Sequence, residues 1–143
     1  MIPKYRAWDE ENKRFLDAEE FIIMPDGRVL VGDWMTGNDF SCGYDDQERF
    51  ILMQSTGLED KNGVEIYKGD IVRYTWDSPN DVNATEEGKR NRVSKVFWSD
   101  WRASFAVGKK SVNSYLFRYV RNGNTVEVIG NIWENPDLLE VAE

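Results

Sequence analysis

The sequence predicts a mainly β fold, either a small, strongly bent sheet or a small barrel, with a β-hairpin region at the N-terminus and a short helix at the C-terminus. Short runs of β-branched and aromatic residues recur along the 143 residues, a pattern typical of strands. Turn residues such as Gly, Pro, Asn and Asp separate these runs. About nine or ten short strands with little helix favour a bent sheet or a barrel.

The N-terminal region is expected to form two hairpins. Residues 5–8 and 13–16 are short strand-like runs on either side of a polar turn. Residues 21–24 and 28–31 flank the sequence Pro25-Asp26-Gly27, in which proline fixes φ and glycine supplies a positive φ. Each pair of runs therefore predicts two antiparallel strands.

The middle of the chain is predicted to alternate strands with tight turns. Residues 50–53 form an apolar run that we interpret as a strand, although periodicity alone also allows a helix. Residues 60–63, Asp-Lys-Asn-Gly, fit a type I turn, and a strand is expected at residues 71–76. Residues 77–92 are almost entirely polar and predict a long, exposed and mobile loop.

The C-terminal part contains further strand and turn signals. Asn122-Gly123 lies between two β-rich runs, residues 115–120 and 125–129, and predicts a hairpin. Asn135 before Pro136 predicts the N-cap of a short terminal helix. Two more strands are expected, at residues 93–98 and 105–107.

Gln54–Ser55 is the most plausible domain boundary, because the tightly turned β block begins there. We therefore predict an N-terminal β-hairpin region over residues 1–54 and a C-terminal β-barrel-like domain over residues 55–143.

Composition excludes several classes of function. The formal net charge of −8 argues against duplex nucleic acid as a partner of the bulk surface. The chain contains no histidine and Cys42 is its single cysteine, so His-dependent catalysis and Cys- or His-rich zinc sites are excluded. Neither a secretion signal nor a membrane span is recognisable, and we expect a cytoplasmic protein without metal or cofactor.

Acidic residues near aromatic side chains are a second kind of candidate site. Two pairs of aspartates lie near aromatic residues, an arrangement that an acid-pair hydrolase would share, but solvated loop acids beside core aromatics are the favoured interpretation. Asp81 and Asn83 lack the spacing of a calcium loop. The two pairs are Asp33 with Asp39 and Asp45 with Asp46, near Trp34, Phe40 and Tyr44.

The candidate interaction surface consists of Trp98, Trp101 and Arg102, which flank or follow a tight connection. Two tryptophans and an arginine can form a stacking platform for bases, sugars or a proline-rich peptide. Lys109-Lys110 would add charge for a single strand. Packing of both tryptophans in the core or on a hairpin is the favoured interpretation, and the platform is the functional alternative.

Three blocks of the chain resemble the YopX family of bacteriophage and prophage proteins. They are residues 4–9, 50–72 and 126–139, and the middle block, with Asp-Lys-Asn-Gly-Val-Glu-Ile-Tyr-Lys-Gly-Asp at residues 60–70, is highly specific. The resemblance implies a small β-rich phage protein, with an SH3-like barrel by analogy, that acts in the cytoplasm of a bacterial host. It supplies no catalytic residue.

Three hypotheses about function follow. The favoured one is a non-enzymatic module that binds a host or phage protein and assembles as a homo-oligomer through strand edges. The second is a nucleic-acid-associated accessory factor, or an acidic mimic of DNA. The third is an acid-pair hydrolase.

Overall fold

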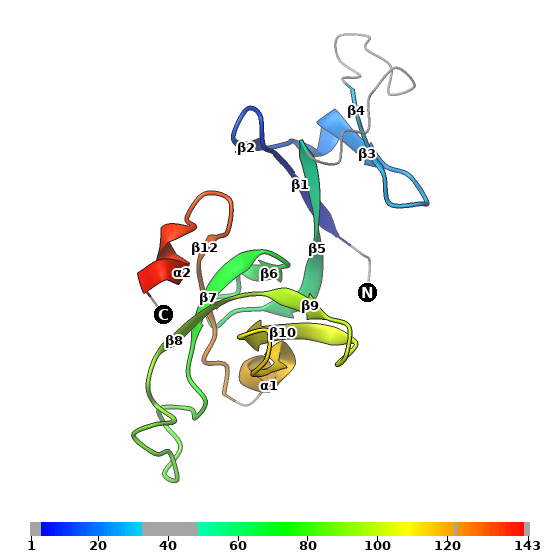
Figure 1. Cartoon of the computed structure of the whole chain (residues 1–143). Coiled ribbons are helices and arrows are strands. Elements are labelled where there is room, and N and C mark those ends of the chain that lie inside the picture. The colour runs from blue at the N-terminus through cyan, green and yellow to red at the C-terminus, as the bar shows by residue number, and fades with distance from the viewer. Residues whose placement is uncertain (1–3, 33–48, 122, 142–143) are drawn as a thin grey trace. The chain divides into compact units, whose positions relative to one another are not determined.

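The computed structural model describes residues 4–32, 49–121 and 123–141, and the predicted mainly β fold is confirmed. The chain forms two compact units, which we call the N-terminal unit (Lys4–Gln54) and the C-terminal unit (Ser55–Glu143). The boundary falls inside strand β5 (Phe50–Glu59), which contributes its first half to one unit and its second half to the other (Figure 1).

The N-terminal unit consists of two hairpins and the first half of β5. Strand β1 (Tyr5–Asp9) pairs with β2 (Arg14–Phe15) on one side and β5 on the other. A short 3₁₀ helix, η1 (Ala18–Glu20), leads into the hairpin of β3 (Phe21–Ile23) and β4 (Val29–Val31). Both predicted hairpins are confirmed. Ala7, Leu16, Val29 and Phe50 form a buried apolar cluster in this unit, and Trp8 and Met53 are buried as well.

The C-terminal unit contains two three-stranded antiparallel sheets. The first has the order β12–β7–β8 and the second β11–β10–β9, while β6 (Glu65–Tyr67) pairs with the second half of β5. The strands curl strongly, as a half-barrel, so the predicted bent sheet is confirmed (Figure 1). The bounds are β7 (Asp70–Tyr74), β8 (Arg92–Lys95), β9 (Phe97–Ser99), β10 (Ser104–Gly108), β11 (Asn113–Tyr115) and β12 (Glu127–Asn131).

The turn predicted at residues 60–63 is confirmed, and its first residue does more than close it. The backbone N–H of Gly63 donates to the carbonyl of Asp60, and Gly63 has a φ of 80°. The buried carboxylate of Asp60 accepts the N–H groups of Asn62 and Val64. Its second oxygen accepts the N–H of Val128 at 2.9 Å, so this aspartate ties the turn to β12.

The hairpin predicted around Asn122-Gly123 is wrong. Leu116–Arg121 form a helix, α1, that packs against β10. Leu116 and Tyr119 are buried and lie three residues apart, which places them on one face of a helix. Gly123, with a φ of 71°, follows the helix end, a position where glycine is strongly favoured.

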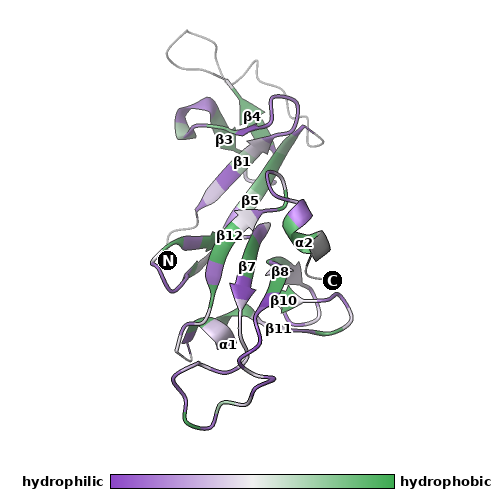
Figure 2. Cartoon of the chain, turned by 90° about the vertical axis from the view of Figure 1, so that its left-hand side faces the viewer, coloured by the Kyte–Doolittle hydropathy of each residue, from purple (hydrophilic) through white to green (hydrophobic). Residues whose placement is uncertain are grey.

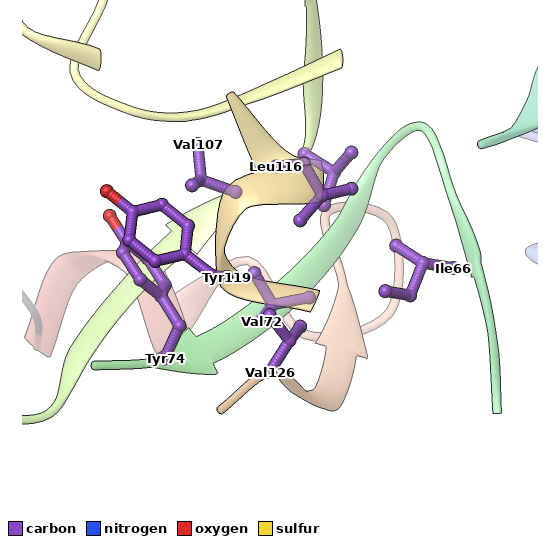
Figure 3. Packing of buried hydrophobic residues seen from close by; sticks show 8 residues of the cluster. Ile66, Val72, Tyr74, Val107, Leu116, Tyr119 and Val126 are labelled. Carbon is purple, nitrogen blue, oxygen red and sulfur yellow. The ribbon is translucent and has the colours of Figure 1, made fainter. Parts of the chain in front are cut away.

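The core of the C-terminal unit lies between the curled strands and α1 (Figure 3). Ile66, Val72, Val126 and Leu116 are fully buried. Burial of such a side chain stabilises a fold by roughly 1.5–3 kcal/mol. Tyr74, Val96, Val107 and Tyr119 complete the cluster.

A short terminal helix, α2 (Asp137–Val141), is present as predicted. The predicted capping role of the Asn135 side chain is wrong. Its Oδ1 accepts the backbone N–H of Asn131 at 3.2 Å instead of an N–H of the helix.

The loop predicted at residues 77–92 connects β7 to β8 and is mostly hydrophilic (Figure 2). Its own hydrogen bonds close it. The Asp77 carboxylate accepts the backbone N–H of Thr85 at 2.9 Å, and the Asp77 N–H donates to the carbonyl of Gly88. A Cβ at Gly88 would lie 1.9 Å from Asp77 Oδ2, so this closure requires glycine.

Candidate functional site

An open basin of about 1350 Å³ lies in the C-terminal unit, walled by β7 and β8, the β10–β11 hairpin, α1 and Leu139 of α2. We call it the basic basin, because the residues that line it include a single carboxylate, Asp77, and seven cationic side chains. These are Arg90, Arg92, Lys95, Arg102, Lys109, Lys110 and Arg118. The whole chain has 18 basic and 26 acidic residues, so the basin runs against the overall charge.

The β7–β8 ladder builds one wall. Tyr74 lies directly opposite Arg92 in the antiparallel register. Directly opposed residues project to the same side of a sheet, and alternate residues along an extended chain share a side. Trp76, two residues after Tyr74, accordingly lines the same basin. The Arg92 guanidinium stacks on the Trp76 ring with its Cζ 3.5 Å from the ring centroid.

The β10–β11 hairpin builds the opposite wall, and a buried serine fixes it to β8. Ser94 Oγ accepts the backbone N–H of Gly108 at 2.8 Å and lies 3.2 Å from the Gly108 carbonyl. Two backbone hydrogen bonds between Lys109 and Val112 then close the turn. Lys109 and Lys110 are therefore presented at the hairpin tip.

The residues predicted as an interaction surface are brought together only in part. Arg102 donates from Nε to Asn113 Oδ1 at 2.5 Å, and its guanidinium lies over the rings of Tyr115 at 4.8 Å and Trp101 at 5.3 Å. Trp101 is 86% exposed beside the basin residue Arg102. Trp98 instead packs edge-on against Phe105, with ring centroids 5.2 Å apart.

Two tyrosines of the core cluster also line the basin. The rings of Tyr74 and Tyr119 lie 4.8 Å apart, and both phenol oxygens point to the same side (Figure 3). The two residues are only 5% and 7% exposed. Burial raises the pKa of Tyr74 to about 12, so its hydroxyl keeps its proton at neutral pH.

Only some of the cationic side chains of the basin are paired with a carboxylate. Glu87 forms ion pairs with Arg90 at 3.2 Å and Arg92 at 3.1 Å. The Asp77 carboxylate is occupied by Thr85 of the connecting loop. In the part of the chain that the structure describes, the five other basin cations form no ion pair; they are Lys95, Arg102, Lys109, Lys110 and Arg118.

Sequence reasoning identified Arg102, Lys109 and Lys110 but missed most of the basin. Arg92 and Lys95 lie at the two ends of β8 and Arg118 lies on α1, and no spacing in the sequence joins the strand to the helix. Trp76 was detectable, because it continues the alternation of the preceding strand.

Other candidates from the sequence contribute no site. Cys42 and both aspartate pairs lie outside the described residues. Asp81 Oδ1 accepts the backbone N–H of Asn83 at 2.9 Å, a local turn contact. Over residues 4–32, 49–121 and 123–141, no group of His, Cys, Asp and Glu is arranged to hold a metal ion. None of the helices described is long and apolar enough to cross a bilayer.

The fold and the basin define a small, mainly β protein with a curled sheet and a concave cationic surface. The chain belongs to the YopX family, because the family model described as YopX protein matches residues 4–140. The family resemblance of the sequence is thereby confirmed.

Two solved structures are similar over almost their whole length. Protein EF1440 from Enterococcus faecalis is 28% identical, with a TM-score of 0.54, and the match covers 97% of this chain and 99% of that one. Protein yopX from Bacillus subtilis is 25% identical, with a TM-score of 0.57, and 94% of each chain is covered. Among curated protein sequences no significant match exists.

Proposed function

We propose that this protein is a non-enzymatic binding protein that holds single-stranded nucleic acid in the basic basin. The observation that carries the proposal is that seven cationic side chains line the basin with a single carboxylate, which is already hydrogen-bonded within the connecting loop. This happens in a chain with a net charge of −8. Cations without carboxylate partners attract phosphates, and binding is driven by the counterions that the phosphates release. The proposal thus takes up the second of the three hypotheses drawn from the sequence.

The aromatic residues favour a single strand over a duplex. Trp76 lines the basin and Trp101 lies beside Arg102, and both rings are more than half exposed. Unpaired bases stack on such rings, whereas bases inside a duplex are already stacked on each other. The acidic remainder of the chain disfavours the extended phosphate contacts that duplex binding uses.

Binding of a dye-labelled dT 12-mer, measured by fluorescence anisotropy at several salt concentrations, tests this function. The charge-reversal variant Lys109→Glu/Lys110→Glu should lose about tenfold or more in affinity and flatten the log–log salt slope by roughly 1.4, which is ~0.7 per phosphate contact. Lys61→Glu/Lys68→Glu is the matched control, because it changes the charge equally outside the basin and should stay within about twofold. A wild-type protein that does not bind the 12-mer at low salt contradicts the proposal.

A protein partner docked at Trp101 is the second candidate function. A tryptophan that is 86% exposed is a common anchor of protein interfaces. Capture from a bacterial lysate should then retain a protein on the wild-type chain that Trp101→Ser fails to retain. Equal recovery by both chains argues against this surface.

We further propose that either activity takes place in the cytoplasm of a bacterium and that the protein is encoded by a phage or prophage, as the family resemblance implies. Genes for phage replication or assembly beside its coding sequence would support that setting. A neighbourhood made up of ordinary bacterial genes would argue against it.

A further inference from the structure

The floor of the basic basin contains two hydroxyl donors that the fold does not use. Tyr74 and Tyr119 are more than nine-tenths buried, yet their phenol oxygens point together to one side (Figure 3). Within the residues described, neither hydroxyl has a hydrogen-bond partner, and both are accessible from the basin. The rings are buried while the two hydroxyls open on the basin, so both donors are available to a ligand there.

A cation lies beside these hydroxyls. Arg92 is directly opposite Tyr74 in the β7–β8 register and shares its side of the sheet. The Arg92 guanidinium stacks on the Trp76 ring and donates to the backbone carbonyls of Glu87 and Arg90. It also pairs with the exposed Glu87 carboxylate at 3.1 Å, which a phosphate would displace. Two neutral donors and a fixed guanidinium match a phosphate oxygen pair, which accepts hydrogen bonds and carries a negative charge.

An aromatic surface lies next to this group of donors. Trp76 lines the basin and is 54% exposed although one face is covered by Arg92. The uncovered part of the ring is available to a base, because stacking requires only a free aromatic face.

We infer that Tyr74, Tyr119 and Arg92 form a phosphate subsite for one nucleotide of the bound strand, and that the base of this nucleotide stacks on Trp76. The inference rests on the proposed function and adds to it the place and the chemistry of a specific anchor. The outer lysines then attract the strand, while the floor fixes its register.

The anchor is tested by removing the hydroxyls alone. Tyr74→Phe/Tyr119→Phe keeps both buried rings and should bind the dT 12-mer about tenfold more weakly, because two hydrogen bonds to a charged group are lost. The salt slope should stay unchanged, because a neutral hydroxyl releases no counterion. Tyr5→Phe in the N-terminal unit is the control and should bind as the wild type does.

The base half is tested separately with Trp76→Leu and two probes. This variant should bind the dT 12-mer about tenfold more weakly than the wild type does. Both proteins should bind an abasic 12-mer of the same backbone equally, because that probe cannot stack. A loss of affinity for both probes would remove the stacking role.

A direct observation does not depend on the variants. With tyrosine labelled by ¹³C at Cζ, the signals of Tyr74 and Tyr119 should shift when the abasic 12-mer is added, while that of Tyr5 stays in place. The proposed function stands if the wild type binds and Lys109→Glu/Lys110→Glu weakens binding. The anchor is nevertheless wrong if the signals of Tyr74 and Tyr119 do not shift and Tyr74→Phe/Tyr119→Phe binds as tightly as the wild type does. If the wild type binds neither probe, both are wrong.

Discussion

The two units of the molecule differ in the cationic side chains that they leave without a carboxylate partner. Residues 1–54 contain 12 acidic and 6 basic residues, and residues 55–143 contain 14 and 12. In the N-terminal unit Lys13, Arg14, Arg28 and Arg49 each form an ion pair with a carboxylate. In the C-terminal unit Lys61, Arg73, Arg90 and Arg92 also form ion pairs, but five basin cations form none among the residues described. The comparison separates charges that hold the fold from charges left available to a ligand.

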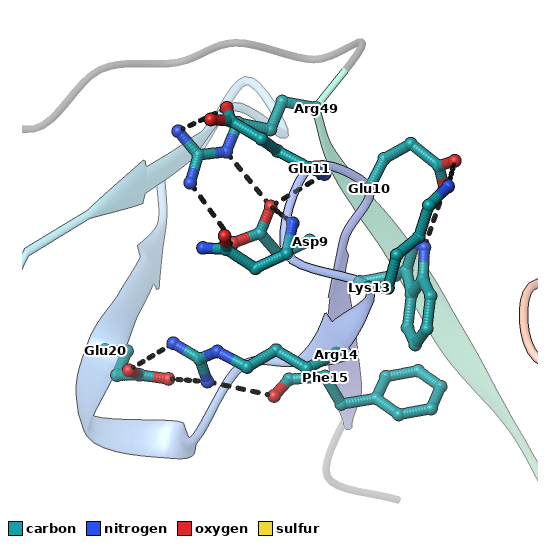
Figure 4. Close-up of polar contacts among 10 residues, drawn as sticks. Asp9, Glu10, Glu11, Lys13, Arg14, Phe15, Glu20 and Arg49 are labelled. Carbon is teal, nitrogen blue, oxygen red and sulfur yellow. Dashed lines mark hydrogen bonds and ion pairs between the residues drawn. The ribbon is translucent and has the colours of Figure 1, made fainter.

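Asp9 shows the structural use most clearly (Figure 4). Its carboxylate is 1% exposed and accepts Nε and Nη2 of Arg49 at 3.0 and 3.2 Å. It also accepts the N–H groups of Glu11 and Asn12. The ion pair joins β1 to the residue that precedes β5. It therefore adds stabilisation to a unit whose apolar core is small.

The largest effect is therefore expected from Arg49→Ala. Removal of the partner leaves a buried carboxylate unpaired, and the free energy of unfolding should fall by about 3 kcal/mol. Lys13→Ala, which removes an exposed pair with Glu10, should cost less than about 1 kcal/mol. Urea denaturation of both variants measures the difference. Equal losses would erase the distinction between a buried and a surface pair.

The same pair predicts a dependence of stability on pH. The hydrogen bonds from Arg49 hold the pKa of Asp9 below its ordinary value of 3.8. The native state then binds fewer protons than the unfolded chain, so this stabilisation is present above pH 3.8 and is lost as pH falls through the lowered pKa. The urea midpoint of Asp9→Asn should be lower at pH 7 but should change less between pH 5 and 2.5 than that of the wild type. A parallel decline of both proteins would remove Asp9 as a cause.

The elements predicted correctly are those whose signals are local. The turn at residues 60–63 and the hairpin around Gly27 depend on φ > 0 at a glycine. The position of each glycine can be read from the sequence. The strand predicted at residues 115–120 is wrong, because its aromatic and β-branched composition favours a strand, whereas the spacing of Leu116 and Tyr119 fits one face of a helix. Packing against β10 decides between the two, and no short stretch of sequence contains that information.

The basin could be predicted only in fragments for a similar reason. Lys109-Lys110 is visible as a dipeptide, but Arg92 and Arg118 join it through the β8–β10 tether at Ser94 and the packing of α1. A net charge of −8 also hides a local excess of the opposite sign. Charge summed over the chain describes solubility and steering, whereas a site depends on which side chains the fold gathers.

The smallest effect on affinity is expected at Glu87. It tests whether this residue belongs with the charges that stabilise the fold or with those that affect a ligand. This carboxylate pairs with Arg90 and Arg92 at the edge of the basin, while Glu86 beside it is exposed and forms no ion pair among the described residues. Because Glu87 occupies the guanidinium groups that a phosphate would approach, Glu87→Gln should raise affinity for the dT 12-mer about two- to fivefold. Stability should change by less than about 0.5 kcal/mol, since these pairs are largely solvated.

Glu86→Gln is the matched control for this prediction, because it removes the same charge one residue away without freeing an arginine. If affinity depends on contact, Glu87→Gln exceeds Glu86→Gln, and the gain persists at 0.2 M salt, where charges separated by more than about 8 Å are largely screened. If the two variants gain equally and lose the gain together in salt, the effect belongs to the overall field. In that case the ion pairs of Glu87 would serve only to hold the connecting loop, and Glu87 would not compete with the ligand for the arginines.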